Sequence, residues 1–126
     1  MVAARVTTGW KLDRAEREAL LKRFPPAYAR TIADHVTLVS TRQGAASAPL
    51  PDFAVGRIVG RADDGSGVEA MVVAIDDTTE RPTGGTYHIT WSLAEGRTAK
   101  QSNNVIAERG WQPLDGGSLA LIPARW

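Results

Sequence analysis

The two histidines of this 126-residue chain occur in the same four-residue setting, His-Val-Thr-Leu at residues 35–38 and His-Ile-Thr-Trp at residues 88–91. Residues two apart in a β-strand lie on the same face of a sheet, so each setting places an imidazole beside a hydroxyl. An imidazole can donate or accept a proton near neutral pH. The pattern therefore predicts two matched pairs for acid–base chemistry, His35 with Thr37 and His88 with Thr90.

Two histidines and two threonines around one phosphate supply every group that displacement at phosphorus requires. One imidazole can remove a proton from the attacking oxygen while the other protonates the leaving oxygen. Hydroxyl groups directed at the non-bridging oxygens stabilise the negative charge of the transition state. These residues therefore predict displacement at phosphorus, with His35, Thr37, His88 and Thr90 as the catalytic residues and with neither a metal ion nor another cofactor.

Both settings resemble the paired H-x-[S/T]-x motifs of the two-histidine (2H) phosphoesterase superfamily. This superfamily includes RNA cyclic phosphodiesterases and the cyclic phosphodiesterase domain of fungal tRNA ligases. The resemblance extends over about residues 9–109 and is most specific at the two motifs. It implies an α+β, bilobed fold in which two antiparallel β units, related by a pseudo-twofold axis, face each other across a central cleft with the helices outside.

The same resemblance implies hydrolysis of a nucleotide or RNA phosphodiester, most commonly a 2′,3′-cyclic phosphate. His35 would protonate the leaving ribose oxygen and His88 would activate water. Three alternatives stay open: a cyclic nucleotide or oligonucleotide signal as the substrate, a 2′-5′ linkage as the substrate, and a module that binds RNA ends or nucleotides without turnover. The pair of histidines favours an enzyme, since binding alone does not require two titrating groups.

Three basic residues near the motifs are candidates for substrate binding. Arg42 follows the first motif, and Arg97 and Lys100 follow the second. Each cation could hold a phosphate, although solvated loop charges are the commoner case. The adjacent carboxylates at residues 63–64 and 76–77 occur in polar loops, where we expect solvated side chains, so no metal site is predicted.

Three further residues beside the second motif are candidates for contacts with a nucleotide. Tyr87 and Trp91 should lie on the face of the strand opposite the His88 side chain, and packing behind the sheet is the expected role. A tryptophan that is exposed could instead stack on a base. Ser102 begins a Ser-Asn-Asn cluster that could contact a nucleotide or cap a short helix.

The predicted elements that must position these residues are mostly strands. Asp13 is a candidate N-cap for a helix that ends before the Pro25-Pro26 pair. Further helical turns are expected at residues 27–33 and a short helix at 98–107, with a loop at 43–52. Strands are expected at residues 3–12, 35–40, 53–62, 68–76, 87–93 and 118–126. This order lacks an alternating βαβ series, which favours an α+β class.

The composition limits the class of partner. The length predicts a single domain over residues 1–126. The formal charge is +1, from 15 basic and 14 acidic residues that are intermixed, which argues against a duplex-DNA partner. No apolar run has the roughly 20 residues of a membrane helix, and no signal peptide is recognisable. We therefore expect a cytoplasmic protein, and the absence of cysteine is compatible with a reducing compartment. We also expect a monomer that acts on a nucleotide or an RNA end.

Overall fold

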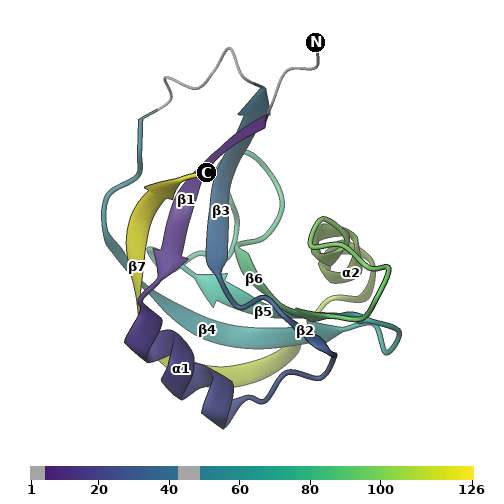
Figure 1. Cartoon of the computed structure of the whole chain (residues 1–126). Helices are drawn as coiled ribbons and strands as arrows, with labels where there is room; N and C mark the ends of the chain where they lie inside the picture. Colours follow the sequence, from purple (N-terminus) through teal and green to yellow (C-terminus); the bar gives the residue numbers. More distant parts are fainter. Residues whose placement is uncertain (1–4, 43–48) are drawn as a thin grey trace.

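The computed structural model describes residues 5–42 and 49–126, with the side chains of residues 7–40 and 49–126 (Figure 1). These residues form an α+β structure, which confirms the predicted class. The elements in chain order are β1 (Arg5–Leu12), α1 (Arg14–Arg23), β2 (Arg30–Thr31), β3 (His35–Arg42), β4 (Ala54–Asp63), β5 (Val68–Ala74), β6 (His88–Leu93), α2 (Gln101–Arg109) and β7 (Gln112–Arg125).

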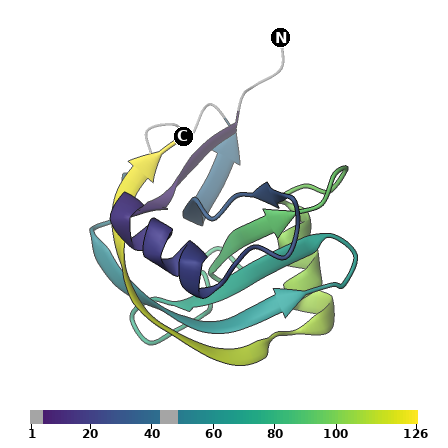
Figure 2. The ribbon, with the colours of Figure 1, turned by 60° about the horizontal axis from the view of Figure 1, so that its bottom comes forward.

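The seven strands form one antiparallel sheet in the order β2-β6-β5-β4-β7-β1-β3. Its two edge strands, β2 and β3, are consecutive in the chain. Between them, the amides of Ile32 and Ala33 donate hydrogen bonds to the carbonyls of Trp91 and Thr90 on β6. Residues 30–42 therefore pair with β6 at one end and with β1 at the other, and the sheet curls back toward itself (Figures 1 and 2).

The two helices lie outside the curled sheet. In Figure 2, α1 lies across one end of the sheet, where it packs against β7. The Asp13 side chain caps α1 by accepting a hydrogen bond from the Glu16 amide at 3.0 Å, as predicted. The Glu16 carboxylate accepts from the Ala120 amide of β7 at 2.7 Å, which attaches the helix to the sheet. Neither helix of the described residues is long and apolar enough to span a membrane.

Two expectations about the elements are corrected. Residues 27–33 are not helical but form a turn followed by β2, because distant side chains bind their amides: Glu69 accepts from Ala27, and Ser92 from Tyr28. Strand β7 begins at Gln112, earlier than the predicted residue 118, and an irregularity opposite β4 accommodates its extra residues. Hydrogen bonds join all seven described strands in one sheet.

The apolar residues of both motifs anchor the motif strands in the core. Val36, Ile89 and Trp91 are completely buried in one hydrophobic cluster. The Trp91 indole nitrogen donates to the carbonyl of Phe24, just after α1, at 2.9 Å. Alternate residues of a strand face opposite sides, so burial of these side chains fixes the direction of the histidine and threonine beside each of them.

Candidate functional site

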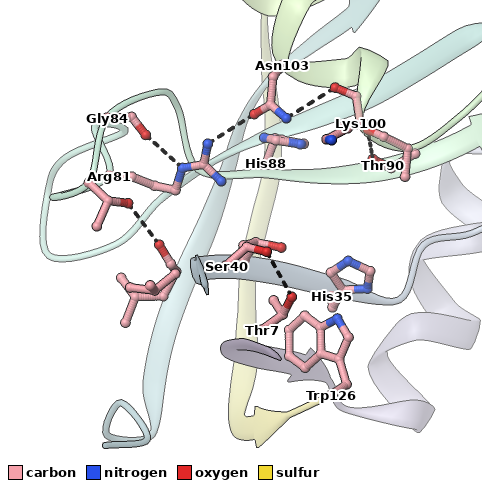
Figure 3. A pocket seen from close by; sticks show the side chains of 15 residues that line it. Thr7, His35, Ser40, Arg81, Gly84, His88, Thr90, Lys100, Asn103 and Trp126 are labelled. Atoms are coloured by element: carbon pink, nitrogen blue, oxygen red, sulfur yellow. Dashed lines mark hydrogen bonds between the residues drawn. The ribbon is translucent and has the colours of Figure 1, made fainter. Parts of the chain in front are cut away.

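Strands β3 and β6 bring His35, Thr37, His88 and Thr90 to one pocket with a volume of about 520 Å³ (Figure 3). The two strands lie against each other because residues 32–34 lead directly from β2, the partner of β6, into β3. The i, i+2 spacing of each motif then directs its imidazole and its hydroxyl to the same side. The pocket thus contains all four residues that the sequence predicted to act together.

The His35 ring is oriented by the preceding residue, Asp34. Its Nδ1 lies 3.0 Å from Oδ2 of Asp34. The Asp34 carboxylate also forms ion pairs with Lys11, through Oδ2, and with Arg14, through Oδ1. Partial burial would raise the pKa of Asp34, but hydrogen bonds from Lys11 and His35 outweigh it and lower this pKa to about 2. An ionised carboxylate only accepts hydrogen bonds, so Nδ1 of His35 carries a proton and Nε2 is left for the pocket.

The His88 ring is oriented by the backbone. Its Nδ1 lies 2.8 Å from the carbonyl oxygen of Thr86, which can only accept, so Nδ1 carries a proton here too. Burial lowers the pKa of His88, and the positive charges of Arg81 and His35 act in the same direction, against the Thr86 carbonyl, which raises it. The neutral ring is therefore favoured, and its unprotonated Nε2 can accept a proton.

The two threonine hydroxyls have different surroundings. Thr90 Oγ1 lies 2.9 Å from Ser102 Oγ and 3.4 Å from the Ala99 carbonyl oxygen. Ser102 is completely buried behind Thr90, so it supports this hydroxyl and does not line the pocket as predicted for a substrate contact. The Thr37 hydroxyl has no hydrogen-bond partner within the part of the chain that the structure describes, which leaves it available to a ligand.

The predicted basic residues lie in different places. Lys100, just before α2, lines the pocket. Arg97 does not: its guanidinium forms an ion pair with Asp64 at 2.8 Å and donates to the Ser66 carbonyl, which ties two loops together. The Arg42 side chain lies outside the described residues. Arg81 lines the pocket as well and was not singled out from the sequence, where it occurs in a polar loop before the second motif.

The aromatic residues near the motifs lie either in the core or in the pocket. Tyr87 and Trp91 are buried behind the sheet, where Tyr87 packs edge-on against Trp10 at 6.0 Å between ring centroids. Trp91 is therefore not a surface for base stacking. Trp126 lines the pocket, with its ring 4.7 Å from that of His35 at 55°. The sequence carried no signal for this residue, because only the pairing of β7 with β1 brings it near the first motif.

The electrostatic character of the pocket suits an anion. Lys100 and Arg81 line it together with the two imidazoles, whereas no aspartate or glutamate does so among residues 7–40 and 49–126. Over the same residues, no group of three potential His, Asp or Glu ligands gathers to hold a metal ion. Comparisons of the chain with protein-family models, with curated proteins and with solved structures gave no match.

Proposed function

We propose that the chain is a metal-independent phosphodiesterase of the 2H type, acting on a nucleotide or RNA phosphodiester and most favourably on a 2′,3′-cyclic phosphate. The observation that carries the proposal is the meeting of both His–Thr pairs in one pocket. Each histidine has its Nδ1 engaged, so that its Nε2 serves the pocket. The fold would be a compact relative of the bilobed 2H arrangement, with β3 and β6 as the facing motif strands.

In the proposed reaction, His88 acts as the base and His35 as the acid. Nε2 of His88 takes a proton from water as the water oxygen forms a bond to phosphorus. The bond from phosphorus to one ribose oxygen breaks, and His35 gives this oxygen its Nε2 proton. The assignment is supported by the burial and the neighbouring charges that favour the neutral form of His88. Thr37 and Thr90 hydroxyls would donate to the non-bridging oxygens.

A substrate screen tests this function. Nucleoside 2′,3′-cyclic phosphates, RNA with a cyclic phosphate end, 3′,5′-cyclic nucleotides, cyclic dinucleotides and a 2′-5′ dinucleotide would each be incubated with the protein in EDTA. Phosphorus NMR would identify the products. We expect a single phosphate monoester from the 2′,3′-cyclic compounds, and no product from a His88→Ala preparation.

Other outcomes of the screen discriminate the alternatives. Turnover confined to a cyclic dinucleotide or a 2′-5′ linkage would support the histidine acid–base mechanism but replace the 2′,3′-cyclic phosphate as the substrate. Binding of these compounds without turnover of any of them would identify a nucleotide-binding module and overturn the proposal. Activity that disappears in EDTA and returns with a divalent cation would overturn the metal-independent mechanism.

A further inference from the structure

The segment between β5 and β6 connects the two sides of the pocket. It leaves β5 at Ala74 and returns at His88, and the hydroxyl of Thr83 donates to the Leu38 carbonyl of β3 at 3.1 Å. Within the segment, two backbone hydrogen bonds close a tight turn: the Arg81 amide donates to the Gly85 carbonyl, and the Gly84 amide donates to the Arg81 carbonyl. The Arg81 backbone is thereby fixed beside the second motif (Figure 3).

The Arg81 guanidinium is held in place by neutral acceptors. Its Nε donates to the Gly84 carbonyl and its Nη2 to Asn103 Oδ1, each at 3.0 Å. The Asn103 amide nitrogen donates in turn to the Lys100 carbonyl at 3.2 Å, which fixes the amide orientation. At Gly85 a Cβ atom would come within 2.6 Å of Nη2, and φ is +82°, so the glycine lets the turn close against the guanidinium.

This arrangement leaves a half-buried cation without a counter-charge. Arg57, Arg61 and Arg97 each pair with a carboxylate, whereas Arg81 has no ion pair within the described residues. Burial lowers the pKa of Arg81, and its charge helps to lower the pKa of His88. A guanidinium has five N–H donors, and the two hydrogen bonds above use only part of them. An anion in the pocket would bind the remaining donors. It would offset both the cost of burying the Arg81 charge and the repulsion between Arg81 and a protonated His88.

We propose that Arg81, oriented by Gly84 and Asn103, binds the non-bridging oxygens of the phosphoryl group in the pocket. The ligand class is a phosphate monoester or diester, and the placement of the phosphoryl group beside the histidines rests on the proposed function. The planar guanidinium presents two parallel donors to such oxygens, which a lysine cannot reproduce. Asn103 is a positioning residue, because it acts through the guanidinium.

The experiment measures binding without requiring turnover. Inorganic phosphate and uridine 3′-monophosphate would be titrated into the wild type and the variants Arg81→Gln, Arg81→Lys and Asn103→Ala, with amide NMR shifts as the readout. Arg81→Gln should weaken binding of both ligands by about ten- to a hundredfold, since hydrogen bonds to charged groups contribute that much. Arg81→Lys and Asn103→Ala should show intermediate losses. The matched control Arg57→Gln, at an arginine outside the pocket, should bind within about twofold of the wild type.

A second measurement distinguishes direct phosphate binding by Arg81 from an effect of the Arg81 charge on His88 alone. The His88 ring proton shifts, followed against pH in the free protein, should report a raised pKa in Arg81→Gln and no change in Arg57→Gln. A raised pKa of His88 with unchanged phosphate affinity would overturn the proposal, because Arg81 would then be a neighbour only. If Arg81→Gln does not fold, unchanged affinity in both Arg81→Lys and Asn103→Ala would overturn it. Phosphate binding that depends on Arg81, in a protein that hydrolyses no ester, would support this anion site and refute the proposed function.

Discussion

At the scale of single residues, the two histidines differ in what holds them. Asp34, a carboxylate, orients His35, and a backbone carbonyl orients the more deeply buried His88. In both rings Nδ1 forms the hydrogen bond that orients the ring, so both histidines can transfer a proton through Nε2. The asymmetry of their surroundings gives a physical reason to assign the acid to His35 and the base to His88, which the two nearly identical motifs do not give.

The assignment of acid and base predicts a selective rescue. A cyclic phosphate with a ribose leaving oxygen needs the acid, whereas a nitrophenyl phosphodiester releases a stable anion that needs no proton. On the nitrophenyl ester, the rate of His35→Ala relative to the wild type should recover by about tenfold or more, while that of His88→Ala should not. Initial rates on both substrates, with equal protein concentrations, measure this. Recovery by His88→Ala instead would reverse the two roles.

The lowered pKa of His88 predicts a loss of stability at mildly acidic pH. In the unfolded chain, His88 has the ordinary histidine pKa of about 6.5. Between this pH and the lower pKa of His88 in the folded protein, the unfolded chain therefore binds more protons than the folded chain. The free energy of unfolding should therefore fall as pH decreases below about 6.5. Urea denaturation at about pH 7 and about pH 5 should show a smaller loss in His88→Gln than in the wild type. An equal loss in both proteins would mean that burial and the charges of Arg81 and His35 do not suppress protonation of His88.

At the scale of elements, side chains from the sheet fix the segment between α1 and β3. The Glu69 carboxylate of β5 is buried and accepts hydrogen bonds from the Ala27 amide at 2.9 Å and from the Ser92 hydroxyl at 2.6 Å, while Arg61 pairs with it at 2.8 Å. These contacts attach the segment to β5 and β6 just before β2. They therefore determine where the first motif strand begins.

Removing this carboxylate should destabilise the fold. Glu69→Ala removes the acceptor of the completely buried Ser92 hydroxyl and that of the Ala27 amide, whereas Arg61 is partly exposed and can turn to water. We expect the free energy of unfolding to fall by about 3 kcal/mol, measured by urea denaturation. The exposed control Glu108→Ala should change it by less than about 0.5 kcal/mol. A loss for Glu69→Ala no larger than that of the control would show that β2 is positioned by other contacts.

Features that depend on residues close together in the sequence were predicted correctly. The i, i+2 spacing of a strand is enough to pair His35 with Thr37, and the cap at Asp13 depends on residues three apart. The prediction for residues 27–33 was wrong, because their hydrogen-bond partners, Glu69 and Ser92, are more than forty residues away in sequence. Propensity alone cannot anticipate such tertiary partners.

At the scale of the whole molecule, the curled sheet explains how distant residues form one pocket. Pairing of β7 with β1 brings Trp126 beside His35, and the segment between β5 and β6 brings Arg81 beside His88. Neither placement follows from sequence spacing. Residues 30–42 connect the two edges, so the motif on β3 and the motif on β6 are held in a fixed relation.

In the proposed mechanism, the two histidines act as one unit on one phosphate. The most direct test is kcat/KM for a nucleoside 2′,3′-cyclic phosphate in EDTA, compared among the wild type, His35→Ala, His88→Ala and the double variant. Each single variant should lose about two to four orders of magnitude, and Thr37→Ala or Thr90→Ala about one to three. The double histidine variant should be little slower than either single variant, because the two proton transfers belong to one step. Losses that multiply in the double variant, or near-wild-type rates in either single variant, would show that the two histidines do not act together on one phosphate.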